Sequence, residues 1–534
     1  MKTLKHYLKF FLPVVATVAL VFASCSSEKE EGALIPKDAY FVADINVNSL
    51  WQKGELAKAD EQLNSVMLIR SFTKAAAPEF DKLLGDMLKA PSSCGIDMER
   101  NISFFMSMNG DKQMAAMTAT LKDEEAFENF LSTLTKDANE VKTSKENGRK
   151  VVNFANVFTG VYDAHNLVFV FDVENQNDIQ GQKAFAAKLF DLDKENSMAA
   201  DKNYNEYLKC RKDLNFFASY ASLFELKNGE ADMEMMFFLP KDDYEALKQA
   251  AIYYTLSFED GSIDFNGGYL GNPIGMTAFM DQKFNDRVLH YMPQTAFIAA
   301  TFAINPEGFY NYLSQIPFLK GLMAESTELG DVKDIINAFG GSFAFDFYGL
   351  EGDKPLFAAA CDIKNAALVD QLLASLGVQN GGTIPNSPAM VYHNDEMLVV
   401  STDSRVIDAA KQGGLGNGMA DIAAKAKEGN YFYMNLKYQD YPTEVLNAIG
   451  FDKLDPSALA FLDLLDYAEA FAESNTLGTF KIRLTDNRNS LATLISTIDN
   501  VAVNYFGFSA TDELAVDNPS VEALEEIDEI GEWE

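Results

Sequence analysis

Residues 102–112 read ISFFMSMNGDK, and residues 343–354 read FAFDFYGLEGDK. Each stretch is a run of aromatic and other apolar residues that ends in Gly-Asp-Lys, which is typical of a β-strand leading into a tight turn. Each is followed by a second apolar run and then by an apolar stripe with helical spacing, over 125–134 and 367–376. The same order of strand, turn, strand and amphipathic helix is therefore predicted twice in one chain.

Three further pairs of stretches match one another in the same order along the chain. Both members of each pair have the composition of β-strands or hairpins. The pairs are 36–48 with 293–305, 161–171 with 391–400, and 216–220 with 431–435. We therefore predict a tandem duplication, with a first unit over 33–290 and a second unit over 291–508.

Most of the predicted strands are joined by short turns. Such turns link antiparallel neighbours, whereas parallel neighbours need long crossovers. The amphipathic helices between the strands need an apolar surface to cover. We therefore expect an α+β fold of two tandem duplicated units, each a mostly antiparallel sheet with helices packed on one face.

The beginning of the chain is typical of a secretory signal. Lys2, Lys5 and Lys9 precede an uncharged apolar stretch over 10–23, which at about 14 residues is too short to cross roughly 30 Å of hydrocarbon. No later segment approaches about 18 uncharged apolar residues. We expect a signal peptide over 1–24 and no transmembrane helix in the mature chain.

The residues Phe22-Ala-Ser-Cys25 resemble the lipobox of bacterial lipoproteins, although Phe22 stands where that motif usually has Leu. The resemblance implies that the Cys25 thiol is lipidated, that cleavage occurs just before it, and that the lipid anchors the protein in a membrane. The acidic cluster over 26–31 resembles the surface-export signal of Bacteroidetes lipoproteins. We therefore expect a lipidated tether over 25–32 and an outer-membrane lipoprotein exposed at the cell surface, with the periplasmic face as the alternative.

The chain is strongly acidic, with a formal net charge of −35 at pH 7, and 48% of its residues are hydrophobic. This apolar content is typical of a folded protein with large cores. The negative charge disfavours nucleic acid and anionic lipid head groups as partners, and solubility is its simplest explanation. The acidic C-terminal tail, 509–534, contains ten acids and no basic residue, so we expect it to be disordered or loosely docked, with docking as a short helix as the alternative.

The motifs of common catalytic and metal sites are missing from the sequence. It contains no Gly-x-Ser-x-Gly elbow and no phosphate loop of the Walker type. The glycines over 413–418 follow a predicted helix rather than a strand, which favours a helix end over a dinucleotide site. Residues 172–178 faintly resemble a calcium loop but lack its glycine and its bidentate Glu, so we expect a surface loop. His165 and His393 lack the spacing of a zinc site and are predicted to be solvent-facing turn residues.

The cysteines and aromatic residues favour structural roles. Beyond Cys25 the chain has Cys94, Cys210 and Cys361, and an odd number in an exported protein argues against a disulfide framework, although one disulfide between two of them stays open. Cys361 lies in an apolar run and is expected in the core. With 79 acidic residues, a pair of neighbouring carboxylates does not single out a hydrolase site. We predict no catalytic, cofactor-binding or metal-binding residue.

The lipobox-like residues before Cys25, the start Ile35-Pro-Lys-Asp-Ala and the duplicated Gly-Asp-Lys hairpins together resemble an uncharacterised family of Bacteroidetes lipoproteins, domain of unknown function 4836. The resemblance spans nearly the whole mature chain and implies exported lipoproteins of about this length. It supplies no catalytic residue, cofactor or ligand.

The leading hypothesis is a lipid-anchored, non-enzymatic cell-envelope protein that binds a glycan, a peptide or a protein partner. It would use the groove between its two units or an exposed strand edge. The first alternative is a hydrolase with an unrecognised carboxylate site, which predicts a deep acidic cleft in one unit only. The second alternative is a carrier of an apolar ligand, which predicts a large apolar cavity between the sheet and the helices.

Overall fold

The computed structural model describes residues 29–506, apart from short gaps. The gaps are 137–140, 155–156, 176, 227–236, 273, 281, 294–295, 324–325, 328–329, 417–418, 420–421, 423–424, 426–429 and 449. Cys25, the signal peptide and the acidic tail therefore lie outside the described residues.

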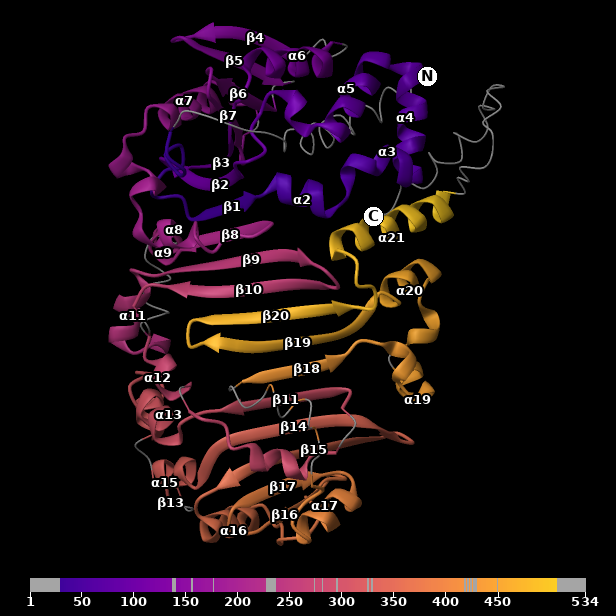
Figure 1. The fold of residues 1–534 in the computed structure, drawn as a ribbon. Helices are drawn as coiled ribbons and strands as arrows, with labels where there is room; N and C mark the ends of the chain where they lie inside the picture. The colour runs from indigo at the N-terminus through magenta and orange to yellow at the C-terminus, as the bar shows by residue number, and fades with distance from the viewer. Residues whose placement is uncertain are drawn as a thin grey trace.

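Eighteen strands form one sheet, which runs along the whole molecule (Figure 1). Those of the first half are β1 (Phe41–Ile45), β2 (Ile102–Asn109), β3 (Lys112–Thr120), β4 (Val141–Glu146), β5 (Arg149–Phe154), β6 (Phe158–Tyr162), β7 (Asn166–Asp172), β8 (Leu214–Ser219), β9 (Ala251–Glu259) and β10 (Ser262–Leu270). Those of the second half are β11 (Ile298–Ala303), β14 (Phe339–Glu351), β15 (Lys354–Ile363), β16 (Met390–His393), β17 (Met397–Ser401), β18 (Tyr431–Asn435), β19 (Leu465–Ser474) and β20 (Leu477–Leu484). A separate small ladder pairs β12 (Ser326–Thr327) with β13 (Gly330–Asp331).

Helices connect the strands. In the first half they are α2 (Val47–Lys53), α3 (Ala59–Gln62), α4 (Asn64–Ala76), α5 (Pro78–Lys89), α6 (Glu124–Thr135), α7 (Ile179–Phe190), α8 (Lys202–Tyr207), α9 (Tyr220–Leu226), α11 (Lys241–Leu247) and α12 (Met276–Met280). In the second half they are α13 (Pro306–Leu313), α14 (Lys320–Met323), α15 (Val332–Asn337), α16 (Ala366–Ser375), α17 (Ser404–Lys411), α19 (Thr443–Ala448), α20 (Pro456–Leu462) and α21 (Ser490–Phe506). Single 3₁₀ turns include η5 (Asp286–Tyr291).

The strand order is the same when read outward from the middle of the sheet in either direction. From β10 the first half runs β10, β9, β8, β1, β2, β3, β7, β6, and an additional hairpin, β5 and β4, forms the edge. From β20 the second half runs β20, β19, β18, β11, β14, β15, β17, β16. The halves join where β10 pairs with β20, and every one of these pairings is antiparallel. The sheet therefore continues through the place where a groove between two units was expected.

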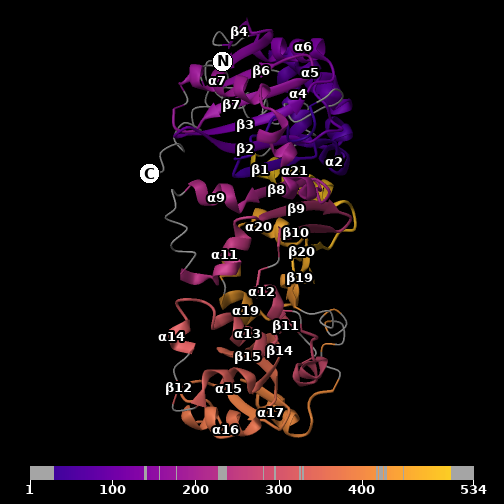
Figure 2. The ribbon, with the colours of Figure 1, turned by 90° about the vertical axis from the view of Figure 1, so that its left-hand side faces the viewer.

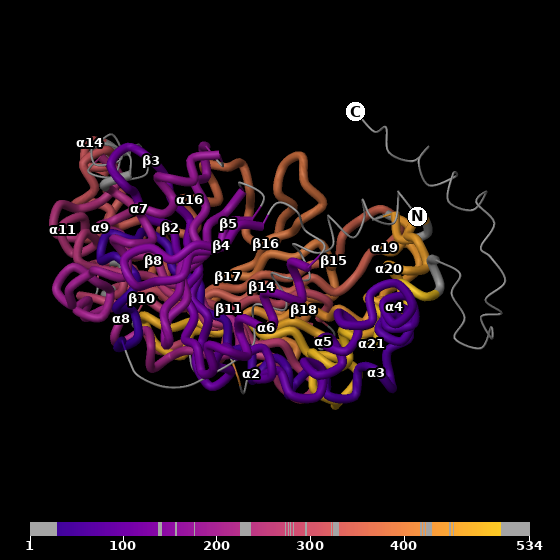
Figure 3. Tube along the Cα trace, turned by 90° about the horizontal axis from the view of Figure 1, so that it is seen from above, coloured from indigo at the N-terminus to yellow at the C-terminus, as the bar shows by residue number. Residues whose placement is uncertain are grey.

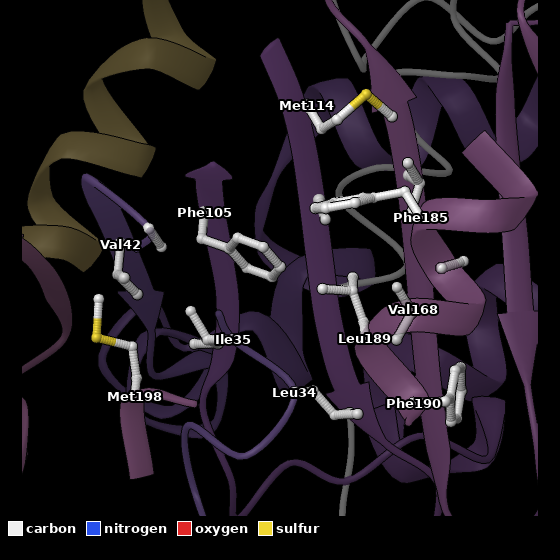
Figure 4. Close-up of a cluster of buried hydrophobic side chains, with 14 of the residues drawn as sticks. Leu34, Ile35, Val42, Phe105, Met114, Val168, Phe185, Leu189, Phe190 and Met198 are labelled. Carbon is white, nitrogen blue, oxygen red and sulfur yellow. The ribbon is translucent and has the colours of Figure 1, made fainter. Parts of the chain in front are cut away.

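Helices cover both faces of the outer strands of the first half, so the prediction that they pack on one face was wrong there. In the first half α7 packs its apolar side on the face that carries Val42, Phe105 and Val168, and this cluster is shown in Figure 4. The opposite face of the same strands is covered by α6, whose residues Phe127 and Phe130 are buried there. Figure 3 shows α7 and α5 on opposite sides of the strands. These outer strands are apolar on both faces, and a helix layer buries each face there.

The expected amphipathic helices are present, with one difference between them. The helix predicted over 125–134 is α6, its start is capped by the Asp123 carboxylate, and its predicted apolar stripe is buried. The helix predicted over 367–376 is α16, which begins at the cap Asn365 and buries Leu373. Leu376, which was also placed on the apolar stripe, is 66% exposed because it lies at the end of the helix, away from the sheet.

At the border between the halves, one helix from each half packs against helices of the other half. The C-terminal helix α21 leaves the second half and packs on α4 and α2 of the first half. There the Asp499 carboxylate accepts hydrogen bonds from the backbone N–H groups of Asn64 and Ser65, at 2.9 and 2.7 Å, and so caps the start of α4. In the other direction α12, which follows β10, packs on α13 through Phe279 and Tyr312. Figure 2 shows α9, α11, α12 and α13 following one another from the first half into the second.

The start of the described chain lies against the first half. Glu30 forms an ion pair with Lys194 at 2.6 Å, and Glu31 forms one with Arg211 at 2.8 Å. The Lys29 ammonium donates a hydrogen bond to the Phe190 carbonyl at 2.6 Å. Residues 29–32, which were expected to belong to the tether, therefore have fixed partners on the body of the protein.

Candidate functional site

The two faces of the central strands differ sharply. On β14 the side chains alternate, so that Phe343, Phe345 and Phe347 share one face and Ala344 and Asp346 share the other. Phe345 is 38% exposed, whereas Asp346 is completely buried. We call the face that carries Phe345 the open face and the opposite one the covered face.

One row of apolar side chains crosses the open face. Its members lie directly opposite one another on neighbouring strands, from β9 to β15. In order they are Leu256, Phe265, Phe480, Ala470, Phe432, Ala300, Phe345 and Ala359. The row crosses the border between the halves at the pair Phe265 and Phe480, whose ring centroids are 5.9 Å apart. The two halves therefore contribute to one continuous apolar surface.

This surface is in contact with solvent. Tyr254 is 55% exposed, Phe302 42%, Phe345 38%, and Phe265 and Phe480 are each 37% exposed. At about 200 Å² for a whole aromatic side chain, these five residues leave roughly 400 Å² of ring surface uncovered. A patch of that size is comparable to the largest one on a typical monomer, which is often functional. In Figure 1 the helices near β9, β10, β20 and β19 lie at the two ends of these strands.

Glycines allow aromatic rings to lie flat on the sheet at its centre. Gly267 and Gly478 pair with one another across the border between the halves. The Tyr254 ring covers Gly267 so closely that an added Cβ would lie 3.0 Å from it, and on the covered face the Tyr253 ring would lie 2.1 Å from a Cβ on Gly268. An aromatic ring that lies over a strand glycine fills the space of the missing side chain and so stabilises the strand pairing there.

On seven of its strands the open face carries no charge, in contrast to the covered face. None of the residues that share the face of the row is charged on the described strands β8, β9, β10, β20, β18, β11 and β14. On the covered face of the same strands, the Lys481 ammonium lies 2.7 Å from the Asp264 carboxylate. Glu469 is buried there and accepts a hydrogen bond from the Tyr431 hydroxyl at 3.0 Å. In a chain with a net charge of −35, an uncharged aromatic face of this extent is exceptional.

The Asp346 side chain is on the covered face, where it is buried in an apolar environment. Its neighbours in register are Ala299 and Ala358, and neither carboxyl oxygen has a hydrogen-bond partner among the described residues. Burial raises the pKa of Asp346 to about 8, so that the carboxyl group is largely protonated at neutral pH. In the matching stretch of the first half the same position is held by Phe105, a core residue. Because it is sealed from solvent, Asp346 has no access to a substrate.

A small polar pocket lies beside the N-terminal segment. It has a volume of about 50 Å³ and is lined by residues 29–35, Arg100, Arg211 and neighbouring strand residues. Behind it Asp44 is fully buried, accepts a hydrogen bond from the Tyr207 hydroxyl at 2.7 Å and lies 3.8 Å from Arg211. Burial raises the pKa of Asp44, and the Arg211 guanidinium opposes that rise. Arg211 also forms an ion pair with Glu31 at 2.8 Å, so it links this buried carboxyl group to the N-terminal segment.

The histidines singled out in the sequence differ from one another. His165 is exposed in the turn between β6 and β7, as predicted. The prediction that His393 faces solvent was wrong, because His393 ends β16, is 5% exposed, and its Nε2 lies 2.9 Å from the Asp370 carboxylate. The helix α16 that packs over this strand supplies Asp370 and covers the ring.

The loop over 172–178 is a capping loop. The Asp172 carboxylate accepts hydrogen bonds from the backbone N–H groups of Glu174 and Asn175, and the Asp178 carboxylate caps α7. Lys112 forms an ion pair with Asp178 and lies 3.8 Å from Asp172, so a lysine neutralises the carboxylates that a cation would need. Among the described residues, no cluster of three or more His, Cys, Asp or Glu side chains has the geometry of a metal site.

The described cysteines are not joined by disulfides. Cys94 and Cys361 are buried, Cys361 as predicted, and Cys210 is half-buried. Burial raises the pKa of the thiols of Cys94 and Cys361 to about 12, which keeps both groups protonated and unreactive. Within residues 29–506 as described, no helix is long and apolar enough to span a bilayer.

Sequence reasoning missed the open face, although the sequence contained one signal for it. The Phe-Ala-Phe-Asp-Phe alternation of 343–347 was interpreted only as part of a β-strand. The signal was that Phe343, Phe345 and Phe347 alternate with Ala344 and Asp346, so that one side of this strand is wholly aromatic.

The protein has a mixed helix-and-strand fold built on one large antiparallel sheet. Comparison with protein families assigns it further: the chain belongs to the family described as domain of unknown function (DUF4836), whose model matches residues 32–491. No curated protein matches the chain.

Among solved structures, crystal forms I, III and IV of TP0453 are similar to this chain, with sequence identities of 6%, 8% and 6%. They cover 71% of this chain and 93%, 94% and 96% of their own chains, with TM-scores of 0.21, 0.21 and 0.19. At TM-scores this low the likeness carries no argument about function.

Proposed function

We propose that this protein is a lipid-anchored, non-enzymatic protein of the cell envelope whose open face binds a protein partner. The observation that carries the proposal is the row from Leu256 to Ala359, which is apolar at every position and crosses both halves. Exposed apolar patches larger than a few hundred square ångströms mark interaction surfaces in soluble proteins. The backbone beneath the patch is hydrogen-bonded into the sheet, so binding requires little ordering of the backbone.

A protein partner is favoured over a glycan by the chemistry of the surface. Glycan sites combine an aromatic platform with polar groups that hydrogen-bond the sugar hydroxyls. The exposed rings here are phenylalanines except for Tyr254, and their neighbours in the row are alanines and Leu256. Such a surface desolvates readily against another apolar surface, and among its five exposed rings the Tyr254 hydroxyl is the single polar group.

The two alternatives predicted from the sequence receive less support. A carrier of an apolar ligand needs a large cavity between sheet and helices, and there the described side chains form packed clusters. A hydrolase needs paired carboxylates in a cleft, and Asp44 and Asp346, the buried carboxyl groups whose pKa burial raises, lie in different halves.

The proposal includes a tandem duplication of one ancestral unit. It is supported by the matching stretches of sequence and by the strand order, which is the same outward from β10 and outward from β20. Duplication accounts for an open face that extends to both sides of the border. A superposition of the strands β1 to β3 and β6 to β10 on β11 and β14 to β20 that failed to align them in order would contradict this part of the proposal.

The proposal also includes the anchor. Lipidation of Cys25 would leave residues 25–28 as the link between the membrane and the segment that is fixed on the first half. The test is incorporation of labelled palmitate, which we expect in the natural chain and not in Cys25→Ser. Protease treatment of intact cells distinguishes the two membrane faces, because only a protein displayed at the surface is cleaved.

Binding is tested by photo-crosslinking in living cells. The photoreactive amino acid p-benzoylphenylalanine replaces Phe265 on the open face, and in a matched control it replaces Leu376, an exposed apolar residue outside that face. We expect a discrete protein adduct from position 265 and none from position 376. If position 265 gives no protein adduct, or gives the same adducts as position 376, the proposal is wrong.

A further inference from the structure

We infer that the β4–β5 hairpin docks on the membrane and binds the phosphate groups of anionic phospholipids beside the lipid anchor. The inference rests on the proposed anchor at Cys25 and adds a second contact between the protein and the membrane. Three features of the hairpin carry it: its charge, its small share in the core, and its position beside the start of the described chain.

The charge of the hairpin is opposite to that of the protein. Residues 141–154 include four basic residues and one acid, in a chain with a net charge of −35. The acid, Glu146, lies 2.7 Å from the ammonium group of Lys183. Two of the basic residues pair with carboxylates of α6 and of the loop after α7. The other two, Lys142 and Lys145, are exposed and form no ion pair among the described residues. Their charges are therefore available to an anionic partner.

Packing within the fold does not account for β4. Val151 and Val152 of β5 are buried in the two cores of the first half, so β5 completes these cores. On β4, in contrast, all five residues after Val141 are exposed. The strand order of the second half ends at β16, which occupies the position of β6 in the first half. A strand that buries little, and that has no counterpart among the described strands of the second half, is free to form a contact outside the fold.

The hairpin lies beside the start of the described chain. The Lys29 ammonium donates a hydrogen bond to the Phe190 carbonyl, and the Arg149 guanidinium, at the start of β5, lies 4.6 Å from the centre of the Phe190 ring. Residues 25–28 span at most about 14 Å when extended, so lipidation of Cys25 would hold this part of the molecule close to the head groups. Figure 1 shows β4 at one end of the sheet and α16 near the other end.

Charge decides which part of an anchored molecule touches an anionic membrane. Head groups of the same sign repel the acidic bulk of the chain, whereas lysines within a Debye length of about 8 Å are attracted. Asn147 and Gly148, with φ of +51° and +83°, form the tight turn that holds β4 against β5. Lysines on an edge strand also oppose pairing with another chain. The membrane contact gives the same two charges a second use.

The experiment attaches the mature full-length chain to vesicles through the Cys25 thiol, which is coupled to a maleimide phospholipid. Cys210→Ser prevents coupling at the half-buried Cys210. The photoreactive p-benzoylphenylalanine replaces the exposed Thr143 on β4 and, in a matched control, the exposed Leu376 after α16. On vesicles of phosphatidylcholine with phosphatidylglycerol, we expect crosslinks to labelled phospholipid from position 143 and few or none from position 376.

Reversal of charge tests the role of the two lysines. Lys142→Glu combined with Lys145→Glu should lower the yield of lipid crosslinks at position 143 by about 10-fold or more, and high salt should also lower it. The control combines Lys364→Glu with Lys453→Glu, which changes two exposed lysines of the second half and gives the same net charge. It should leave the yield unchanged. Circular dichroism confirms that each variant folds, which is expected because the exchanged side chains are exposed.

The outcomes separate this inference from the proposed function. Because the anchor is attached chemically, the result does not depend on lipidation in the cell, which the palmitate experiment tests. Equal yields at positions 143 and 376, a yield that the hairpin variant leaves unchanged, or an equal yield on phosphatidylcholine alone overturns the inference. A protein adduct at position 143 in living cells, in place of a lipid adduct, also overturns it. The open face is tested separately at position 265.

Discussion

Replacing the buried carboxyl group of Asp346 should make the protein less sensitive to rising pH. Asp346 is completely buried, has alanines opposite it on both neighbouring strands, and has no hydrogen-bond partner at either oxygen among the described residues. The variant Asp346→Asn keeps the shape of the side chain and removes its titration. An alanine-lined site holds a neutral side chain at lower cost than a carboxylate.

The size and sign of the effect follow from the shifted pKa. Burial raises the pKa of Asp346 from 3.8 in the unfolded chain to about 8 in the folded protein. Between these pH values the folded state binds one proton more than the unfolded state. The contribution of Asp346 to the free energy of unfolding is therefore most favourable below about pH 4 and becomes less favourable as the pH rises towards 8. Each pH unit between the two pKa values corresponds to about 1.4 kcal/mol. The free energy of unfolding of the natural protein should therefore fall by up to about 6 kcal/mol because of this group.

The assay is chemical denaturation of the purified protein at intervals between pH 4 and pH 8. We expect the free energy of unfolding of Asp346→Asn to rise relative to that of the natural protein as the pH increases, with most of the change between pH 5 and pH 8. Asp353→Asn, in the exposed turn between β14 and β15, is the control and should show a constant difference. A difference between Asp346→Asn and the natural protein that does not change with pH would refute the reasoning.

Three further predictions test other parts of the structure. Asp499→Ala removes the cap on the start of α4 and should lower the free energy of unfolding by about 1–2 kcal/mol, measured by denaturation, with Asp499→Asn losing less. Gly341→Ala should lower the free energy of unfolding by about 3 kcal/mol or more, because φ is +102° and the new Cβ would lie 2.0 Å from a carbonyl oxygen. Gly352→Ala, at φ +63° with open space around it, should lower it by about 1 kcal/mol. Equal melting temperatures for the two variants would contradict this prediction. Cys94 and Cys361 should resist iodoacetamide in the folded protein and react after denaturation, as mass spectrometry of the alkylated peptides would show; modification at native pH before unfolding would count against the burial described.

Local features of the fold could be read from the sequence because they depend on neighbouring residues. The Gly-Asp-Lys turns are present between β2 and β3 and between β14 and β15, where Gly110 and Gly352 adopt positive φ. The spacing of Phe127 and Phe130 placed the buried side of α6 correctly. Antiparallel pairing followed from the short turns.

The side of each central strand that faces solvent could not be read in the same way. The alternation in 343–347 fixes which residues share a face, and the usual expectation that phenylalanine is inside and aspartate outside gives the wrong answer here: Asp346 is buried and Phe345 is exposed. Which face is covered depends on where η5 and α17 pack, and that depends on contacts between segments far apart in the sequence. The pairing of β10 with β20 has the same origin, because it joins strands more than 200 residues apart.

The position of α21 at the end of the chain affects the order in which the molecule is completed during synthesis. When α4 leaves the ribosome, the aspartate that caps it has not been made, and at 5–20 residues per second it follows roughly 20–90 s later. During that interval β10 also lacks β20 and presents an unpaired edge to other nascent chains. A transcript that ends before codon 477 should therefore yield an aggregation-prone, protease-sensitive fragment and not a stably folded half of the protein.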